Sequence, residues 1–174
     1  MDFMELCKQR YSGRAFDRNR PIPEEKLEKI LEAARLAPSG CNAQPWKVLV
    51  LESEEALEKT RECSECVYDA PIVLVFLYDK SHPDSTLEIN GVDVGLTSGV
   101  IAATFSMLAV TEQGIGSCWV CWFHEEILRK TFQIPENWVP VCLLPIGYDR
   151  EGPGAATSAA SRWKTLCRGS ELIL

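Results

Sequence analysis

The sequence has few of the side chains that usually carry acid–base catalysis, because only two of its 174 residues are histidines. His82 lies in a polar stretch and His124 at the start of an expected helix, and neither belongs to a metal-spaced pair or a nucleophile signature. A Walker motif and a dinucleotide-binding fingerprint are also absent. We therefore expect two solvated histidines and no catalytic side chain, so that any reactivity must come from another agent.

Positive charge is also scarce. Lys and Arg number 18 against 25 Asp and Glu, which gives a net charge of −7 and a sequence pI of about 4.9. This balance argues against a nucleic-acid backbone or an anionic membrane as a partner. Any basic cluster would then form a local positive pocket within an acidic protein.

Targeting and membrane-spanning segments are not expected either. The first five residues hold acids where a signal peptide needs a basic and then an apolar region, so we expect a cytoplasmic protein. The most apolar stretches are residues 72–78 and 94–110, and hydroxyl side chains interrupt the second. Neither stretch is predicted to cross a membrane.

Cysteine, in contrast, is abundant, with eight residues, although structural disulfides are not expected in the cytoplasm. The pairs Cys63-x-x-Cys66 and Cys118-x-x-Cys121 raise the possibility of a zinc or iron–sulfur site. We favour free thiols, because residues 117–123 have the pattern of a strand, and strand alternation directs residues three apart to opposite faces. The lone residues Cys7, Cys142 and Cys167 are likewise expected to be buried free thiols.

Helical and strand patterns alternate along the chain, with no internal repeat or domain linker. We expect helices at residues 3–10, 23–37, 54–65, 93–113 and 125–132, strands at 47–51, 72–78, 117–123 and 139–148, and an exposed loop at 79–90. Pro140 and Pro145 are expected to break the last strand. Residues 151–161 have the Gly, Ala and Ser content of a flexible or extended arm.

The predicted helix 93–113 carries apolar residues on nearly every face, which indicates a helix buried all round. A single domain of this size rarely buries a helix completely. A subunit interface would explain the pattern.

The cluster Arg10-Tyr11-Ser12-Gly13-Arg14 places two guanidinium groups and a hydroxyl at alternate positions where a short helix must end. Guanidinium forks suit bidentate recognition of a phosphate. The cluster therefore predicts an anion site, although exposed arginines can also be ordinary surface cations paired with acids.

A second cluster spans residues 38–46 (PSGCNAQPW), where a hydroxyl and two side-chain amides lie between two prolines and beside Trp46. Several neutral hydrogen-bonding groups are thus held on a stiff loop next to a large aromatic. This suits a polyhydroxylated, ring-bearing ligand, while the amides could instead simply cap the loop.

Together with the stretch at residues 114–119 (GIGSCW) and the following Trp122-Phe123, these clusters resemble the nitroreductase family of FMN-dependent oxidoreductases. The resemblance covers residues 1–148, with a C-terminal remnant at Arg162-Trp163-Lys164. It implies an α+β fold with a mostly antiparallel central sheet flanked by helices, in an intertwined homodimer. Residues 1–174 would form one FMN-binding domain, with 149–174 as a C-terminal arm.

The resemblance also implies a set of flavin-binding residues drawn from two chains. Arg10 and Ser12 would meet the phosphate or ribityl chain, and Arg14 the pyrimidine edge. The loop at 38–44 would come from the second subunit, and Cys121 and Trp122 would offer backbone N–H groups. The full set is Arg10, Tyr11, Ser12, Arg14, Pro38, Ser39, Gly40, Asn42, Gln44, Cys121, Trp122, Arg162 and Lys164, with no metal ligand.

The implied activity is hydride transfer from NADH or NADPH to FMN and then to a small acceptor such as a quinone or a nitroaromatic, with the flavin supplying the reactivity. Larger family members carry extra helices where this chain has only the loop at 79–90, so the acceptor stays open. Two alternatives are a flavin dehydrogenase or reductase for a dedicated metabolite, and a flavin- or metal-binding module without turnover.

Overall fold

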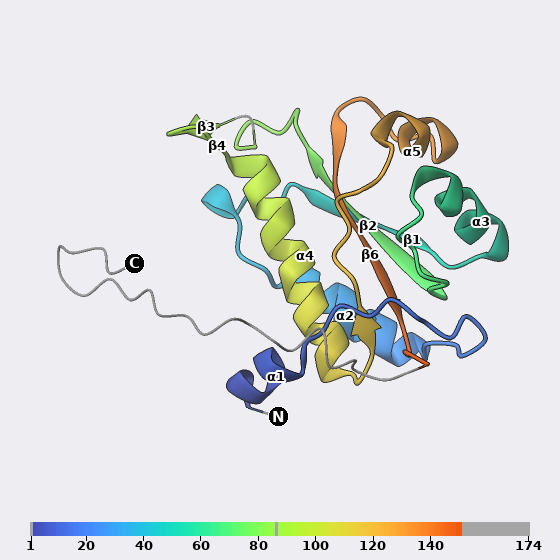
Figure 1. Ribbon diagram of the computed structural model, residues 1–174. Coiled ribbons are helices and arrows are strands. Elements are labelled where there is room, and N and C mark those ends of the chain that lie inside the picture. The colour runs from blue at the N-terminus through green and yellow to red at the C-terminus, as the bar shows by residue number, and fades with distance from the viewer. Residues whose placement is uncertain (1, 86, 151–174) are drawn as a thin grey trace, which may run out of the picture.

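The computed structural model describes residues 2–85 and 87–150, which form a sheet with helices on both faces (Figure 1). The sheet order is β1-β2-β6-β5, and every neighbouring pair is antiparallel. These strands are β1 (Trp46–Leu51), β2 (Ile72–Asp79), β6 (Trp138–Gly147) and β5 (Gly116–Ser117). The helices are α1 (Phe3–Gln9), α2 (Glu24–Arg35), α3 (Glu54–Cys63), α4 (Val94–Glu112) and α5 (Glu125–Thr131). The predicted α+β class with an antiparallel sheet is confirmed.

Strand β2 lies between β1 and β6 in the sheet, and all its residues before Asp79 are buried. Side chains alternate along a strand, so Leu74 and Phe76 enter the core under α2 and α4, whereas Val73 and Val75 enter the core under α3 and α5. A strand buried on both faces needs apolar residues at every position. The continuous apolar run predicted this place in the sheet correctly.

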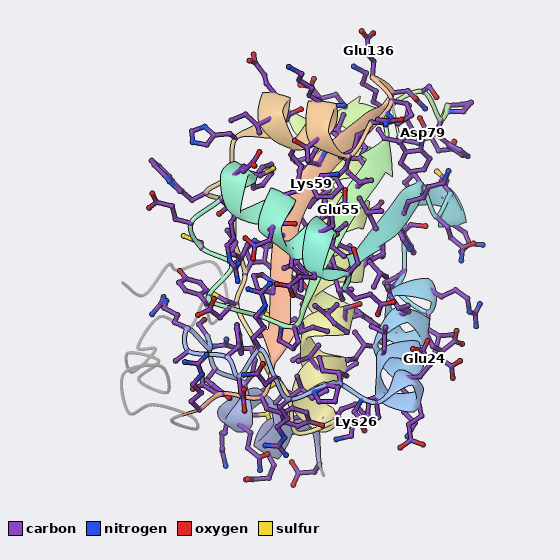
Figure 2. The ribbon with its side chains drawn as sticks, turned by 90° about the vertical axis from the view of Figure 1, so that its right-hand side faces the viewer. Glu24, Lys26, Glu55, Lys59, Asp79 and Glu136 are labelled. Atoms are coloured by element: carbon purple, nitrogen blue, oxygen red, sulfur yellow. The ribbon has the colours of Figure 1, made fainter. Side chains whose placement is uncertain are left out.

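Helices α2 and α4 form the layer on one face. Leu27, Ile30 and Ala34 make the buried stripe of α2. Ser106 of α4 donates a 2.9 Å hydrogen bond to the Ile30 carbonyl, and the Lys26 ammonium, labelled in Figure 2, donates a 2.7 Å bond to the Gln113 carbonyl. These contacts fix α2 along the C-terminal half of α4.

Helices α3 and α5 cover the opposite face (Figure 1). Ser53 caps α3 through a 3.2 Å bond from the Ala56 N–H, and Leu57 and Cys63 bury its inner face. Glu55 and Lys59 lie one turn apart on its outer face, where they form an ion pair (Figure 2). Exposed i,i+4 pairs of this kind contribute only a few tenths of a kcal/mol, so packing against the sheet holds this layer.

Helix α4 is only partly covered within one chain, so the complete burial expected from its sequence would require the subunit interface that was expected with it. Ala102, Ala103, Ser106 and Val110 are buried, but Leu96, Val100 and Phe105 stay 37–41% exposed. By length and composition α4 is the one helix in the described part of the chain that could span a membrane. Its buried face against α2 and the sheet makes it a core helix.

Three local predictions were wrong. The strand expected at 117–123 ends at Ser117, and beyond it only Val120 forms an isolated bridge, to Leu143. The loop 79–90 contains β3 (Glu88–Ile89), which pairs with β4 (Val92–Asp93). Strand β6 continues through both of its prolines.

Candidate functional site

The first predicted cluster lies where α1 ends and the chain joins the sheet. Arg10 caps α1 with extended backbone angles (φ −61°, ψ 127°), and its N–H donates a 3.0 Å bond to the Leu6 carbonyl. Ser12 then forms a parallel bridge with Ser117 of β5, and the Gly13 N–H donates a 2.9 Å bond to the Ser117 carbonyl. The cluster is therefore fixed to the sheet edge through its backbone, which leaves its side chains for a ligand.

Two glycines allow this close approach. A Cβ at Gly116 would lie 2.7 Å from the Tyr11 hydroxyl oxygen, and a Cβ at Gly13 would lie 2.7 Å from the ring of Phe16, which is fully buried. Real Cβ atoms do not approach other atoms this closely. Burial, followed by the charge of Asp149, raises the pKa of Tyr11, so this phenol stays protonated near neutral pH.

Ser117 is the site residue that sequence reasoning missed. Its hydroxyl oxygen is buried and has no hydrogen-bond partner within the described residues. A buried hydroxyl without a partner costs about 1–3 kcal/mol, so such a group is a reason to expect a ligand. The sequence did contain a signal, because Ser117 directly follows the Gly114-x-Gly116 pair of the third family motif.

Arg14 lies near Tyr68 and Cys118, where its positive charge and hydrogen-bonding groups lower the pKa of both side chains against other effects that raise it. Burial raises the pKa of Cys118, while the nearby positive charge of Arg14 acts in the opposite direction. A surface role would require Arg14 to form an ion pair with Asp2, Glu24 or Glu25. No such ion pair is found among the described residues.

The second cluster forms a strained, exposed loop around the short 3₁₀-helix η1 (Gly40–Asn42). Cys41, Asn42 and Gln44 all adopt left-handed backbone angles, with φ of 52°, 54° and 49°. The Ser39 hydroxyl closes the loop by accepting a 2.9 Å bond from the Gln44 N–H. Such conformations are costly for residues other than glycine, and they hold the two amide side chains toward solvent.

This loop packs against the N-terminal end of α4. The Gly40 N–H donates a 3.3 Å bond to the Ser98 hydroxyl, and a side chain at Gly40 would collide with Val94. Nearby, the Tyr78 hydroxyl donates a 2.9 Å bond to Asp93, whose other oxygen caps α4 at the Leu96 N–H. Burial, then this bond, raises the pKa of Tyr78 to about 12.

One chain does not bring the two clusters together. The first lies at β5, directly after the C-terminal end of α4, and the second contacts the N-terminal end of α4. The helix has 19 residues, which at 1.5 Å per residue separates its ends by about 28 Å. In Figure 1, α1 accordingly lies at one end of α4 and the β3–β4 hairpin at the other.

The stretch at residues 114–119 and the following Trp122-Phe123, which carry the third part of the family resemblance, run along the sheet edge at and after β5. The N–H groups of Cys118 and Val120 donate to the Pro145 and Leu143 carbonyls of β6. Backbone alternation directs the Cys121 N–H away from β6, toward the side that a ligand could occupy. Trp122 is 78% exposed, and its carbonyl accepts a 2.7 Å bond from Ser64.

The other sequence predictions have mixed outcomes. Cys118 is buried and Cys121 exposed, and none of the described residues forms a group of three or more potential metal ligands. Cys142 is a buried thiol as expected, but Cys7 is exposed, and no residue of α1 is buried. Arg162, Lys164, Cys167 and the expected arm lie outside the described residues.

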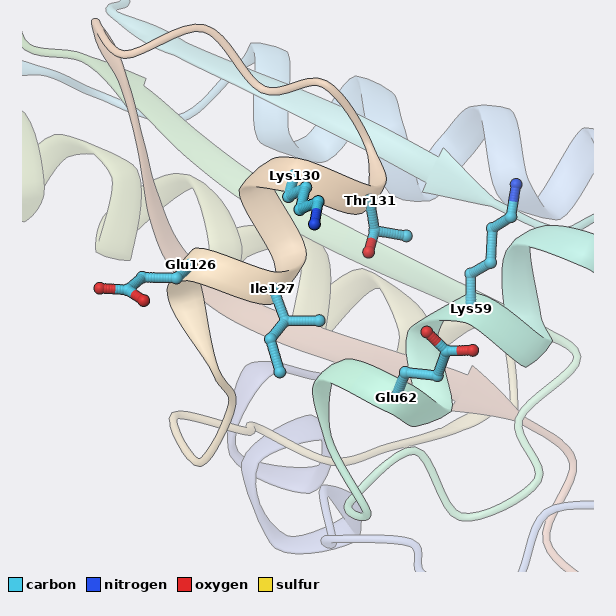
Figure 3. A pocket seen from close by; sticks show the side chains of 6 residues that line it. All are labelled: Lys59, Glu62, Glu126, Ile127, Lys130 and Thr131. Atoms are coloured by element: carbon cyan, nitrogen blue, oxygen red, sulfur yellow. The ribbon is translucent and has the colours of Figure 1, made fainter.

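One hollow on the surface lies away from this site. A cavity of about 560 Å³ lies between α3 and α5 (Figure 3). Figure 3 shows Lys59 and Glu62 on one helix facing Ile127, Lys130 and Thr131 on the other. Its mixed charges and lack of any predicted site residue point to a surface depression between two helices.

Comparisons with known proteins agree with this geometry. The model of the nitroreductase family matches residues 7–66 and 57–148. A Methanothermobacter thermautotrophicus protein named for NADH dehydrogenase and NAD(P)H nitroreductase activity is 36% identical over 162 residues, covering 88% of this chain and 81% of that protein.

Solved structures are also similar. A nitroreductase family protein from Clostridium difficile has a TM-score of 0.83 at 35% identity, covering 89% of this chain and 88% of its own. A nitroreductase from Exiguobacterium sibiricum, solved in complex with FMN, has a TM-score of 0.76 at 25% identity, covering 86% and 89%. The chain belongs to the nitroreductase family.

Proposed function

We propose that this protein is an FMN-dependent oxidoreductase that oxidises NADH or NADPH and reduces a small acceptor such as a quinone or a nitroaromatic. The observation that carries this proposal is the junction of the first cluster with β5. There, a segment with two arginines and the hydroxyl side chains of Tyr11 and Ser12 runs along a glycine-lined edge. It lies beside the buried Ser117 hydroxyl, which has no hydrogen-bond partner among the described residues. The relatives named for NAD(P)H and FMN support the same assignment.

The residues of this junction fit FMN. Arg10 and Ser12 provide donors for a phosphate or a ribityl hydroxyl, and Arg14 provides a fixed positive charge at the other side of the cluster. The inward Tyr11 and Ser117 hydroxyls are neutral donors and acceptors. FMN, when bound, would accept a hydride from the nicotinamide and pass the electrons to the acceptor, so the chain needs to supply only binding and orientation.

We further propose a homodimer whose flavin sites lie at the subunit interface. The partly exposed Leu96, Val100 and Phe105 give α4 an uncovered apolar face, of the kind that obligate interfaces bury. A two-fold axis across α4 would bring the 38–44 loop of one chain to the first cluster of the other. Pro38, Ser39, Gly40, Asn42 and Gln44 would then act in trans.

Three further features belong to the same proposal. Residues 1–174 form one FMN-binding domain, with 149–174 as an arm that brings Arg162 and Lys164 to the phosphate. The protein works in the cytoplasm, which fits its seven described cysteines, all of them free thiols. The partners are small molecules and a second copy of the chain, with neither nucleic acid nor membrane.

The proposal is tested on purified protein under anaerobic conditions. We expect a yellow protein that carries FMN, is bleached by NADH or NADPH and regains colour when a quinone or nitroaromatic is added. A flavin that stays oxidised with both nicotinamides would contradict the oxidoreductase and leave a passive binder. A colourless protein that does not bind added FMN would contradict the site itself.

A further inference from the structure

A pocket on the face of the sheet that α3 and α5 cover belongs to neither part of the candidate flavin site. Its volume is about 240 Å³, and it lies between β1 and the segment that follows α5. Leu49 of β1 and Leu77 of β2 line it from the sheet, and Ile134 lines it from the segment. Every lining residue except Lys47 and Gln133 is apolar. The pocket is therefore an opening into the core under α3 and α5.

The outer wall of the pocket is fixed by its own hydrogen bonds. The Ile134 N–H donates a 2.9 Å bond to the Arg129 carbonyl, and the Trp138 N–H donates a 3.0 Å bond to the Pro135 carbonyl. The Arg129 guanidinium donates a further 3.1 Å bond to the Pro135 carbonyl. Within this segment Gln133 has a left-handed φ of 51°, which is costly for a residue other than glycine. The wall is thus held in one conformation, so a ligand would not have to order it on binding.

Lys47 carries the one charge among the residues that line the pocket. Its ammonium lies 4.3 Å from the centre of the Trp138 ring, and this cation–π contact holds it beside the apolar walls. Arg129 of the neighbouring helix is paired with Glu125 at 2.8 Å, whereas no carboxylate within residues 2–85 and 87–150 forms an ion pair with Lys47. The pocket therefore combines apolar walls with a positive charge that an anion can pair with.

We propose that this pocket is a second small-molecule site, which binds planar aromatic carboxylates. The rings would lie against Leu49 and Leu77, and the carboxylate would accept a charge-assisted bond from the Lys47 ammonium. An apolar cavity of about 150 Å³ holds benzene, so a pocket of about 240 Å³ suits two fused rings. The ammonium would favour an anion over a neutral ring of the same shape, and it would repel a cation.

This site is separate from the flavin site proposed above. The pocket lies at β1 and the first cluster at β5, which are the two edge strands of the sheet, with β2 and β6 between them. Three strand spacings of about 4.8 Å place these edges about 14 Å apart. The proposal therefore does not rest on flavin chemistry, and its failure would leave the proposed function untouched.

The test titrates the intact purified protein by calorimetry with naphthoate and with naphthalenemethanol, a neutral analogue of similar shape. Lys47→Gln should weaken naphthoate binding about five-fold, the upper range for a partly exposed ion pair, and should leave naphthalenemethanol binding unchanged. Lys59→Gln is the matched control. Its ammonium pairs with Glu55 on the outer face of α3, so this variant should bind both compounds as the parent does.

A second pair of variants locates the rings. Ile134→Ala removes part of the pocket wall and should weaken the binding of both compounds. Ile127→Ala should weaken neither, because Ile127 is 41% exposed on α5 and lines the other hollow. The absorbance of any bound FMN is recorded in parallel, because a ring that stacks on the flavin would change it.

Four results would overturn the proposal. The first is no naphthoate binding at millimolar concentration, and the second is equal naphthoate affinity in Lys47→Gln and the parent. The third is an equal loss in Lys59→Gln, which would indicate a general effect of charge. The fourth is an FMN absorbance that changes in step with the whole calorimetric signal, because the ligand would then occupy the flavin site.

Discussion

The two ends of helix α4 carry the two parts of the candidate site, and they are built differently. At the C-terminal end, the first cluster is bonded to β5 through Ser12 and Gly13 and rests on the fully buried Phe16. At the N-terminal end, the 38–44 loop is exposed, and three of its residues hold left-handed angles. We call the first cluster together with Ser117 the anchor, because it is bonded to the sheet and packs on the core. The 38–44 loop, in contrast, faces solvent.

This difference has a functional consequence. The anchor ends in a buried hydroxyl, Ser117, that lacks a partner among the described residues, while the loop holds two amides toward solvent about 28 Å away. The anchor therefore has the buried hydroxyl and the loop has the amides, and a single chain does not bring these groups together. We infer that the anchor binds the charged part of the ligand and that the loop of a second chain completes the site.

The largest expected effect comes from removing the support of the anchor. Phe16→Ala should lower the free energy of unfolding by about 3–5 kcal/mol, because it leaves a cavity under Gly13, Gly116 and Gly147. Urea denaturation measures the change. Phe3→Ala is the matched control, since that ring is 65% exposed and its loss should change stability by less than about 0.5 kcal/mol.

The next effect concerns ligand affinity at the anchor. A charge-assisted bond is worth about 1.5–3 kcal/mol, so Arg10→Ala should weaken FMN binding by about ten- to a hundred-fold without a comparable loss of stability. Fluorescence titration with FMN measures the dissociation constant. Lys8→Ala, on the exposed face of α1, is the control and should bind as the parent does. Equal affinity in Arg10→Ala and parent would remove the phosphate role.

A smaller loss is expected at the loop. The double variant N42G/Q44G removes both amides while glycine suits the left-handed angles, so neutral hydrogen bonds are lost without added strain. We expect FMN binding to weaken by about five- to thirty-fold, which corresponds to about 1–2 kcal/mol. Cys41→Gly has the same backbone setting and no amide. If this control weakens binding equally, loop flexibility rather than the amides is responsible.

The smallest effect tests the base of the loop. The folded state raises the pKa of Tyr78 from 10.0 to about 12, so the neutral phenol stabilises the fold below pH 10 and this contribution is lost as the pH rises to about 12. Tyr78→Phe should cost about 1 kcal/mol at neutral pH, through the bond to Asp93, and the difference from the parent should shrink over that window. Parallel stability curves would contradict the assignment.

Much of the fold could be predicted, because hydrophobic periodicity reflects burial directly. The continuous apolar run of β2 and the stripe of Leu27, Ile30 and Ala34 gave these elements their correct places. The failure at 117–123 arose because alternating apolar residues need a paired strand along their whole length to form a strand. Beyond Ser117 only Val120 forms a bridge, although the Cys118 N–H also donates to the Pro145 carbonyl.

The prolines of β6 show a second limit. The Leu143 N–H donates to the Val120 carbonyl of the edge segment after β5. Pro145 lies two residues further along β6, so its backbone nitrogen points to the same side as that of Leu143. The N–H that proline lacks would therefore face the edge segment and not β2. A proline is tolerated where the ladder needs no donor. That depends on the neighbouring strand, which the sequence of β6 alone does not reveal.

The site was predictable only where its residues are close in sequence. The first cluster and the 38–44 loop were identified because each contains several polar groups within a few residues. The position of Ser117 beside Ser12 and the nearness of Arg14 to Tyr68 and Cys118 depend on residues about 50 to 100 positions apart. Such contacts follow from tertiary packing, and local patterns do not determine them.

The most direct test of the shared site mixes two defective chains in one dimer. Co-expressed, differently tagged Arg10→Ala and N42G/Q44G chains are purified as a mixed dimer and titrated with FMN. If each site combines the anchor of one chain with the loop of the other, one site carries every substitution and the other carries none, so half of the sites should bind with the affinity of the parent. If one chain supplies both parts, every site carries a defect, and the absence of any parent-affinity class would contradict the account.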